Sequence, residues 1–535
     1  MTWKKCCSLA LVILLTASLL AGCSTPSNTA KQSEKVLRYS AGAEPRTLDP
    51  RKSTGTPDTT IEAQLFEGLT ALDAKETAVP AVAERWDVSA DGLKYTFYLR
   101  SNAKWSNGDA VTAHDFVYSW TTALSPDLAS EYAYQLYYIK NGEAFNKGQV
   151  KAEDLGIKAL DDRTLEVTLE NPTAYFLTLL AFHTYYPVHK KTVEANSNWA
   201  TDVKTMISNG PFAITNWVHN SKIEFIKNVH YWDAGKVKLT KLEFFLTDSS
   251  TTELAMFDNG QIDIGDNPPT TEFSRLKKEN KLVIKPFLGT YFYSFNVTSP
   301  PFDNIKVRKA FSLAINREAI INNITKGEQK AALSWIPPGL QDSKAADFRQ
   351  IGGNFLKDND IETAKQLLAE AGYPGGKGLP PITLIYNTNE MHKAIAEAVQ
   401  EMWKKQLGVT VVLANQEWKV FLDNRHKGFY QIARNGWIGD YADPMTFLDM
   451  FMSDSGNNEA QYKNPEYDKL VAFAKSTGDL ALRQKALHDA EKLLFDDAVF
   501  APIYFYTRPS VIKPGVKGYI RSVLGTLYFK EAYIE

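Results

Sequence analysis

The chain has 535 residues, a formal net charge of −2 at pH 7 and 44% hydrophobic residues. This balance excludes the strongly basic face that a nucleic-acid partner would need, and the length favours about three domains of ~150 residues. The eight histidines include no pair with metal-ligand spacing, so we expect no metal and no cofactor.

The first residues are typical of an export signal. Lys4 and Lys5 precede the apolar run 8–22, which is shorter than the ~20 residues of a spanning helix. The four residues LAGC (20–23) resemble a bacterial lipobox, which predicts a signal peptide over 1–22 and lipidation of Cys23. The alternatives are a plain secretory signal and an ordinary cysteine in a frayed tail. The polar stretch 23–35 is then a flexible tether, and the membrane holds the protein through lipid on its extracytoplasmic face.

Cysteine usage agrees with export and excludes thiol chemistry. The three cysteines, at 6, 7 and 23, leave with the signal or carry the lipid. The mature domain therefore has no disulfide and no nucleophilic thiol.

The region from 67 to 190 reads as a mixed α+β insert. Strands are expected over 93–100 and 164–170, with turn signals between them. The stretch 112–124 is typical of a helix with Thr112 as its N-cap.

Two strand–helix–strand units follow. In 241–266, a strand at 242–246 leads to a helix that begins after Ser249 and ends at Asn259-Gly260, and a strand resumes at 262–264. In 381–418, a strand at 382–386, a long helix ending before Gly408 and a strand at 409–413 repeat the pattern, and such crossovers suit parallel strands. Because the units lie far apart in the chain, we expect two separate α/β lobes rather than one large sheet.

One segment combines acids with aromatic residues. Residues 434–451 read RNGWIGDYADPMTFLDMF, in which Asp440, Asp443 and Asp449 lie among large apolar and aromatic residues that include Trp437, Tyr441, Phe447, Leu448 and Phe451. Carboxylates go inside only when something pairs them. The partner could be an internal Arg or Lys, a metal ion or a cationic group on a ligand, with a structural ion pair or turn as the plainer reading.

The sequence offers little to an enzyme. It has no Gly-x-Ser-x-Gly elbow and no His-Glu-x-x-His motif. The loop 372–378, GYPGGKG, fails as a phosphate loop because Ala371 replaces its first glycine and Gly378 its Ser or Thr. We expect no catalytic residues and no enzyme activity.

Several segments together resemble the oligopeptide-binding branch of solute-binding protein family 5, the lipoproteins of bacterial peptide ABC importers. The resemblance covers essentially the whole mature chain and is most specific where W-S-N-G-D-x-V-T-A-H-D-F and D-Y-x-D-P occur in this order. Its main segments are TLDPRKSTGTPDTTIEAQLFEGL (47–69), LRSNAKWSNGDAVTAHDFVYSW (99–120), ISNGPFAITNWV (207–218), PFDNIKVRKAFSLAINREAI (301–320) and NQEWKVFLDNRHKGFYQIARNGWIGDYADPMTFL (415–448).

The resemblance implies an α/β fold of the three-lobed periplasmic-binding-protein type (type II, cluster C), with a hinged ligand cleft between lobes I and III. The implied boundaries are lobe I from 36–66, 191–291 and 508–535, lobe II over 67–190, and lobe III over 292–507.

It also implies a role for the acidic segment. Asp440 is expected to bind the free α-amino group of a peptide, which is protonated below its pKa of about 7.7–8.0 and pairs well with a buried carboxylate. Asp443, before Pro444, is expected to cap the next helix, and Asp449 to face solvent. The alternative for Asp440 is a structural pair.

Further site residues follow from the same resemblance. Backbone pairing with an extended peptide is expected at Gly436, Trp437 and Ile438, with Thr54, Gly55 and Thr56 on the facing segment. Arg434 and His392 are expected to bind peptide carboxylates, with a buried pair and a surface residue as their respective alternatives. Tyr132, Trp418, Trp437, Tyr504 and Tyr506 are expected to line side-chain pockets, although each could be simple core. Thr54 stands where some relatives carry an acid, which weakens any expected preference for basic peptides.

The resulting hypothesis is a monomeric extracytoplasmic lipoprotein that captures short peptides in extended form, largely independent of side-chain sequence, and delivers them to the permease of a membrane ABC importer. The alternatives are a relative dedicated to dipeptides, signalling peptides, cell-wall peptides, nickel chelates or haem, and a peptide-sensing interaction protein.

Overall fold

The computed structural model describes residues 35–173, 175–342 and 346–535. The predicted signal peptide, the lipidation site Cys23 and the predicted tether up to residue 34 lie outside the described residues. Among the helices that are described, none combines the length and apolar character needed to cross a bilayer.

One mixed sheet organises the chain. Its hydrogen-bonded order is β15-β14-β16-β12-β17-β11-β1-β10-β9-β8, with β13 attached to β17. The strands at one end, here called the N-terminal strand group, are β1 (Val36–Gly42), β8 (Phe212–Val218), β9 (Lys222–Lys227), β10 (Lys241–Leu246) and β11 (Ile264–Gly265). The C-terminal strand group at the other end consists of β14 (Ile382–Asn387), β15 (Val411–Gln416) and β16 (Ile432–Ile438).

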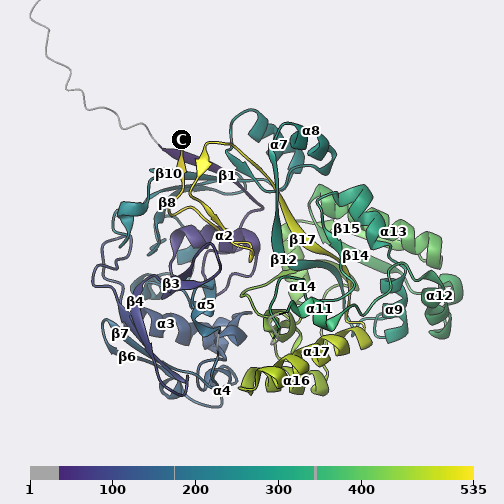
Figure 1. Ribbon diagram of the computed structural model, residues 1–535, viewed down its shortest axis with the longest axis horizontal. Helices are drawn as coiled ribbons and strands as arrows, with labels where there is room; N and C mark the ends of the chain where they lie inside the picture. The colour runs from purple at the N-terminus through teal and green to yellow at the C-terminus, as the bar shows by residue number, and fades with distance from the viewer. Residues whose placement is uncertain (1–34, 174, 343–345) are drawn as a thin grey trace, which may run out of the picture. The chain divides into compact units, whose positions relative to one another are not determined.

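The expectation that the two units do not share one large sheet is therefore wrong, whereas their division into two lobes stays a prediction. The two predicted units do lie at opposite ends, but β12 (Leu282–Phe295) and β17 (Phe500–Ile512) connect them without a break in the order. These two long strands pair antiparallel and run side by side between the groups (Figure 1). Their register shifts between Pro286 and Thr290, because Pro286 has no N–H to donate and the chain bulges there.

The first predicted unit is confirmed as β10, α7 (Ser250–Asp258) and β11. Ser249 caps α7 by accepting the Thr252 N–H at 3.2 Å, and Gly260 follows the helix at a φ of +77° that favours glycine. β10 and β11 are both parallel to β1, which lies between them. The second strand is shorter than predicted and begins at Ile264.

The second predicted unit is confirmed as β14, α13 (Glu390–Leu407) and β15. Asn389 caps α13 through the Met391 and His392 N–H groups, and Gly408 ends it at a φ of +68°. Its apolar face is buried through Ile395, Val399 and Trp403. β14 and β15 are parallel, as predicted, although β15 begins at Val411 rather than 409.

A separate four-stranded antiparallel sheet forms the predicted α+β insert. Its order is β4 (Ala83–Val88), β5 (Lys94–Leu99), β7 (Thr164–Thr168) and β6 (Ile157–Asp161). The predicted helix is α3 (Ala113–Leu124), where the Asp115 carboxylate accepts the Thr112 N–H at 2.8 Å. Trp105, Phe116 and Trp120 are fully buried in this region.

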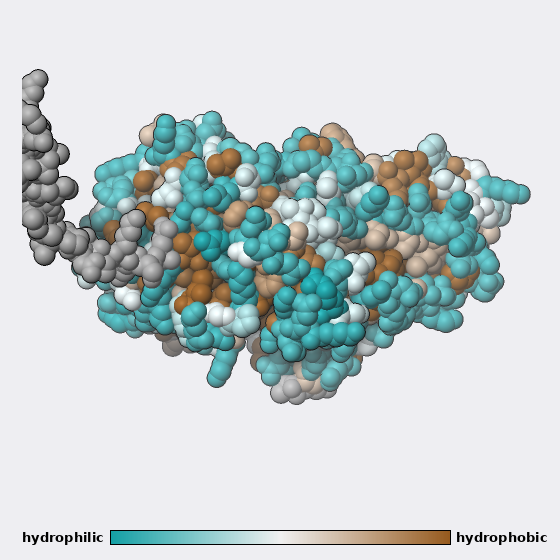
Figure 2. All heavy atoms as spheres, turned by 90° about the horizontal axis from the view of Figure 1, so that it is seen from above, coloured by the Kyte–Doolittle hydropathy of each residue, from teal (hydrophilic) through white to brown (hydrophobic). Residues whose placement is uncertain are grey.

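The remaining elements cover these sheets or connect them. Further helices are α2 (Thr56–Leu65), α9 (Ile305–Leu313), α12 (Ile361–Glu370), α14 (Trp418–His426), α15 (Met445–Leu448), α16 (Pro465–Ser476) and α17 (Leu480–Asp496). Short pairs are β2 (Thr70–Leu72) with β3 (Ala78–Pro80), β18 (Val516–Lys517) with β21 (Tyr533–Ile534), and β19 (Ile520–Arg521) with β20 (Leu527–Tyr528). On the face shown in Figure 2, hydrophobic residues form separate patches among hydrophilic ones.

Candidate functional site

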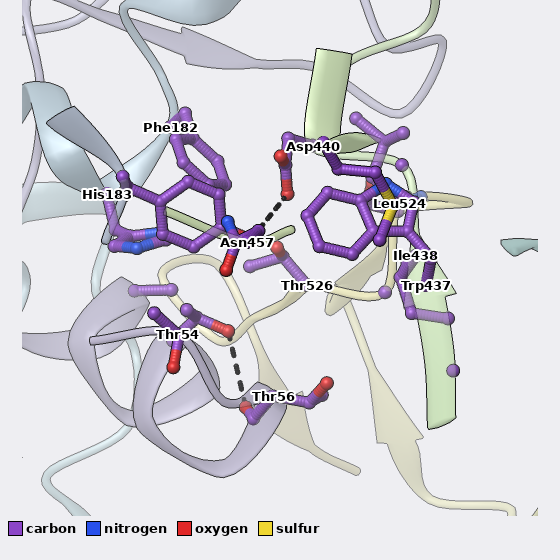
Figure 3. Close-up of a pocket in the computed structure, with 18 of the residues that line it drawn as sticks. Thr54, Thr56, Phe182, His183, Trp437, Ile438, Asp440, Asn457, Leu524 and Thr526 are labelled. Carbon is purple, nitrogen blue, oxygen red and sulfur yellow. Dashed lines mark hydrogen bonds between the residues drawn. The ribbon is translucent and has the colours of Figure 1, made fainter. Parts of the chain in front are cut away.

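A cavity of about 130 Å³, here called the central cavity, brings distant parts of the chain together. Thr54 and Thr56 belong to the start of α2, and Phe182 and His183 follow the insert sheet. On the other side lie β16, its continuation to Asp440, and the C-terminal loop 522–528. Figure 3 shows Thr54 and Thr56 across the cavity from Trp437, Ile438 and Asp440.

The backbone of β16 has a free edge beside this cavity. β14 pairs with β16 only at Ile432 and Ala433, and no other described strand continues along that edge. On the opposite edge, the Asn296 N–H donates to the Gln431 C=O, and the Gly439 N–H donates to the Leu288 C=O, so both ends of this edge are bonded to β12 or its continuation. Residues alternate along a strand, so Gly436 and Ile438 direct their N–H and C=O groups away from β12. The Gly436 N–H donates to the Asn435 side-chain oxygen at 2.8 Å.

Gly436 keeps this edge accessible. A Cβ built at this position would clash with the Tyr506 hydroxyl, so a larger residue would displace that side chain. The absence of a side chain also allows another backbone to approach closely.

Asp440 ends this edge with a carboxylate that lacks a cation. Its two oxygens accept hydrogen bonds from the Tyr132 hydroxyl at 3.2 Å and from the Gln135 amide at 2.9 Å. No described basic side chain forms an ion pair with it. Burial, and then the negative charge of Asp449, raise the pKa of Asp440 well above its usual value. An ammonium group in the cavity would be a suitable counter-charge.

The other two acids of this segment are already occupied. Asp443 accepts the Met445 N–H at 2.9 Å at the start of α15 and forms a bidentate pair with Arg483 at 2.7 and 3.0 Å. The prediction that Asp449 faces solvent is wrong, because its side chain is 0% exposed. It packs beside Tyr441 and Lys475, and burial raises its pKa to about 6 although Lys475 opposes the shift.

Part of the facing segment, 54–56, is engaged in contacts with its own neighbours in the fold. The Gly55 N–H donates to the Asp58 carboxylate at 3.3 Å, and Trp418 packs against Gly55, at 3.2 Å from a Cβ built there. The Thr54 hydroxyl is buried and has no hydrogen-bond partner among the described residues. Thr54 thus presents an unused donor and acceptor beside the cavity.

Arg434 and His392 lie near each other but outside the cavity lining. The Arg434 guanidinium donates to the Tyr506 hydroxyl at 2.9 Å and lies 4.8 Å from the Tyr291 ring centre, with no described carboxylate as partner. His392 Nδ1 lies 3.4 Å from the Tyr291 hydroxyl. Burial, and then the charge of Arg434, lower the pKa of His392 well below its usual value, so this imidazole is neutral.

The aromatic residues divide into two sets. Tyr132 and Trp437 line the central cavity, as the sequence predicts. Tyr504 instead stacks on Tyr291 at 4.9 Å, and Tyr506 contacts Arg434, so neither belongs to the lining, nor does Trp418. The pocket-lining role of these three stays a prediction.

A charged network beside the cavity escaped sequence analysis. His426 places Nε2 2.9 Å from Glu131 and Nδ1 3.2 Å from Glu459, while Arg46 pairs with Glu131 at 3.0 Å and Arg425 with Glu459 at 2.9 Å. The network joins the insert region to the end of α14. These residues share no spacing or motif, so only the fold brings them together.

Within the described residues, no group of three His, Cys, Asp or Glu side chains is placed to hold a metal ion.

Two connected strand groups with a cavity between distant parts of the chain are the arrangement of a solute-binding protein. The profile of bacterial extracellular solute-binding proteins, family 5 Middle, matches residues 77–459, and the chain belongs to this family. The chain is 41% identical to the oligopeptide-binding protein OppA of Bacillus subtilis, over 99% of this chain and 100% of that protein.

Solved structures show the same fold. The substrate-binding domain of an oligopeptide ABC transporter from Bacillus anthracis aligns with a TM-score of 0.90 and 35% identity, covering 94% of this chain and 99% of that one. Haemophilus influenzae OppA in complex with the peptide RPPGFSPFR aligns with a TM-score of 0.88 and 34% identity, over 94% and 99% of the two chains.

One pair of comparisons bears on conformation. The Escherichia coli murein tripeptide-binding protein MppA aligns with a TM-score of 0.88, whereas the unliganded open form of MppA aligns with 0.62, both at 36% identity and 94% coverage of this chain. The present structure therefore differs in arrangement from that open form.

Proposed function

We propose that this protein captures short peptides in extended form and delivers them to a membrane ABC importer. One observation carries the proposal: the free edge of β16 ends at Asp440, a buried carboxylate with no described cationic partner. An extended peptide with a free α-amino group supplies both missing partners, a strand for the edge and an ammonium for the carboxylate.

Backbone pairing explains capture that is largely independent of sequence. Every peptide residue other than proline offers one N–H and one C=O, and the Gly436 C=O and both backbone groups of Ile438 are the complementary groups. The Gly436 N–H would exchange its hydrogen bond to Asn435 for one to the peptide. Trp437 lies between Gly436 and Ile438, and Thr54, Gly55 and Thr56 provide the facing wall. Tyr132 and Trp437 border the space for side chains.

The peptide carboxylate is assigned to Arg434 and His392. Arg434 has no described anionic partner, and its Nε finds no hydrogen-bond partner among the residues that the structure describes. A carboxylate near it would also favour protonation of His392, whose pKa burial and Arg434 lower in the peptide-free protein. Two basic residues beside the same tyrosine, Tyr291, would share the binding of one peptide carboxylate.

Closure is assigned to a hinge in β12 and β17. Their register shift near Pro286 lies close to the proposed boundaries of lobe I (36–66, 191–291, 508–535) and lobe III (292–507), with lobe II over 67–190. The Glu131–His426 contact joins lobes II and III in the closed arrangement. Peptide contacts made only on closing would supply the free energy for it.

The remaining parts of the proposal concern location and chemistry. Lipidation at Cys23 would hold a monomer on the extracytoplasmic face of the membrane. The bound peptide would leave unchanged, because the site holds and orients it and no residue is assigned to bond cleavage.

Titration calorimetry with trialanine, an unrelated tripeptide and N-acetyl-trialanine tests this function. The two free peptides should bind with comparable affinity, and acetylation should weaken binding about 30-fold or more, since it removes the ammonium from a buried pair. Equal binding of the acetylated peptide would refute the amine anchor. Failure of both free peptides to bind would refute peptide capture.

A further inference from the structure

A second cavity, of about 200 Å³, lies behind the central one. One wall comes from the segments 134–143 and 170–173 next to the insert sheet, and the other from 449–455 and α16. Tyr132, which lines the central cavity, stacks on Tyr134 of the second cavity with ring centres 5.7 Å apart. Asn457 completes this partition by donating to the Tyr134 hydroxyl at 3.1 Å. The two cavities are thus separate neighbours.

The inner end of the second cavity holds an unsatisfied carboxylate oxygen. Asp449 is 0% exposed, and its Oδ2 accepts the Tyr441 hydroxyl at 3.1 Å. The Lys475 ammonium lies 3.7 Å from the same Oδ2, beyond direct hydrogen-bond distance. Oδ1 has no hydrogen-bond partner among the described residues. A buried acceptor left without a donor costs about 1–3 kcal/mol, which a ligand N–H would recover.

The outer end of the cavity is acidic and exposed. Glu143, Glu170 and Asp454 lie there, and the Lys147 ammonium is shared between Glu143 at 2.5 Å and Asp454 at 2.8 Å. Among the described residues, the Glu170 side chain accepts a hydrogen bond from the Asn141 N–H alone, at 2.9 Å. The four carboxylates of the lining thus face the two ammonium groups of Lys147 and Lys475, so negative charge remains in excess.

Aromatic rings line the path between the two ends. The hydroxyls of Tyr134, Tyr137 and Tyr138 are engaged with Asn457, Asn146 and Tyr441 respectively. The aromatic rings of these tyrosines are therefore the part that can contact a ligand in the second cavity. Tyrosine faces stabilise both alkyl chains and cations.

We propose that the second cavity binds a small linear alkyl diamine, with one ammonium on Asp449 Oδ1 and the other at the acidic rim beside Glu170. The alkyl chain would lie along the three tyrosine rings. A primary ammonium supplies the missing donor at Oδ1, and a second one offsets the excess negative charge at the rim.

Titration of the full chain with 1,4-diaminobutane tests this site, with 1,4-butanediol as the uncharged compound of the same length. The diamine should bind saturably and the diol should not. Asp449→Asn should weaken diamine binding about tenfold or more, because Oδ1 loses its charge. Asp496→Asn, an exposed carboxylate on α17 that pairs with Lys492, is the matched control and should bind as the parent does.

Two further variants separate the possible outcomes. Ala472 is exposed on α16 and lines the cavity, so Ala472→Trp should block entry even if Asp449→Asn fails to fold. Asp440→Asn should leave diamine binding intact, since the peptide amine site is a different one. Absence of saturable binding would overturn the proposal, as would equal binding of the diol or unchanged binding in both Asp449→Asn and Ala472→Trp. Loss of binding in Asp440→Asn would assign the diamine to the central cavity instead and refute the second site.

Discussion

Replacing Asp440 by asparagine separates a ligand anchor from a structural ion pair. The substitution keeps the shape and removes the charge: the amide oxygen can accept the hydrogen bond of the Gln135 amide, and the new NH2 can donate to the Tyr132 hydroxyl, which donates to the carboxylate in the parent. A structural acid would need that charge to hold the fold. In this structure the charge has no described cationic partner, so the fold gains nothing from it.

The substitution should leave the stability of the peptide-free protein unchanged or higher, and it should lower the affinity for peptide. Burial raises the pKa of Asp440, so this group favours folding at low pH, and that contribution is lost as the pH rises through the raised pKa. Ionisation of the buried carboxylate above its raised pKa is a cost to the peptide-free protein, and Asp440→Asn, which cannot ionise, should leave the melting temperature unchanged or higher. Peptide affinity should fall by about 2–5 kcal/mol, roughly 30- to 4,000-fold, because the peptide ammonium loses its partner in a buried site.

Calorimetry with trialanine and thermal denaturation of the peptide-free protein measure the two effects. The informative result is the combination of weaker binding with undiminished stability. A lower melting temperature together with unchanged affinity would show that Asp440 is a structural residue and would refute the reasoning. Asp496→Asn, remote from the cavity, serves as the control for the substitution itself.

Four further predictions concern the same protein. Peptide affinity should fall as the pH drops below the raised pKa of Asp440 and binding should release a proton, whereas Asp440→Asn should show neither effect in calorimetry at several pH values. His426→Gln should weaken trialanine binding about tenfold, because Glu131 and Glu459 lose their shared partner. The control His114→Gln, at an exposed position, should bind as the parent does. Equal affinities of His426→Gln and the parent would show that this network does not contribute to closure. Gly436→Ala should also weaken binding about tenfold, since its Cβ meets the Tyr506 hydroxyl, and unchanged calorimetry would contradict this. Glu491→Gln should lower the free energy of unfolding in urea by about 3–5 kcal/mol by breaking the buried pair with Arg349, and a loss below 1 kcal/mol would count against that pair.

Local sequence signals predicted individual elements well. Ser249 and Asn389 are good N-caps, and Gly260 and Gly408 favour the left-handed conformation that ends a helix, so α7 and α13 follow from a few residues each. The connection of the two strand groups into one sheet has no such signal. It depends on β12 and β17, whose pairing spans a large separation along the chain and is set by tertiary packing.

The partners of the three acids in 434–451 could not be predicted from local sequence either. Their neighbours in sequence are alike, yet Asp443 pairs with Arg483, Asp449 packs near Lys475 and Asp440 has no described basic partner. Each partner lies in a later helix. The family resemblance singled out Asp440, but the burial of Asp449 required the fold.

The central claim, capture of peptides by backbone and amine, is tested most directly by native mass spectrometry of the protein purified from cells, followed by release and sequencing of what it carries. The account predicts a mixture of short peptides with free N-termini, related in length and unrelated in sequence. A single bound species, or ligands without a free amine, would contradict it.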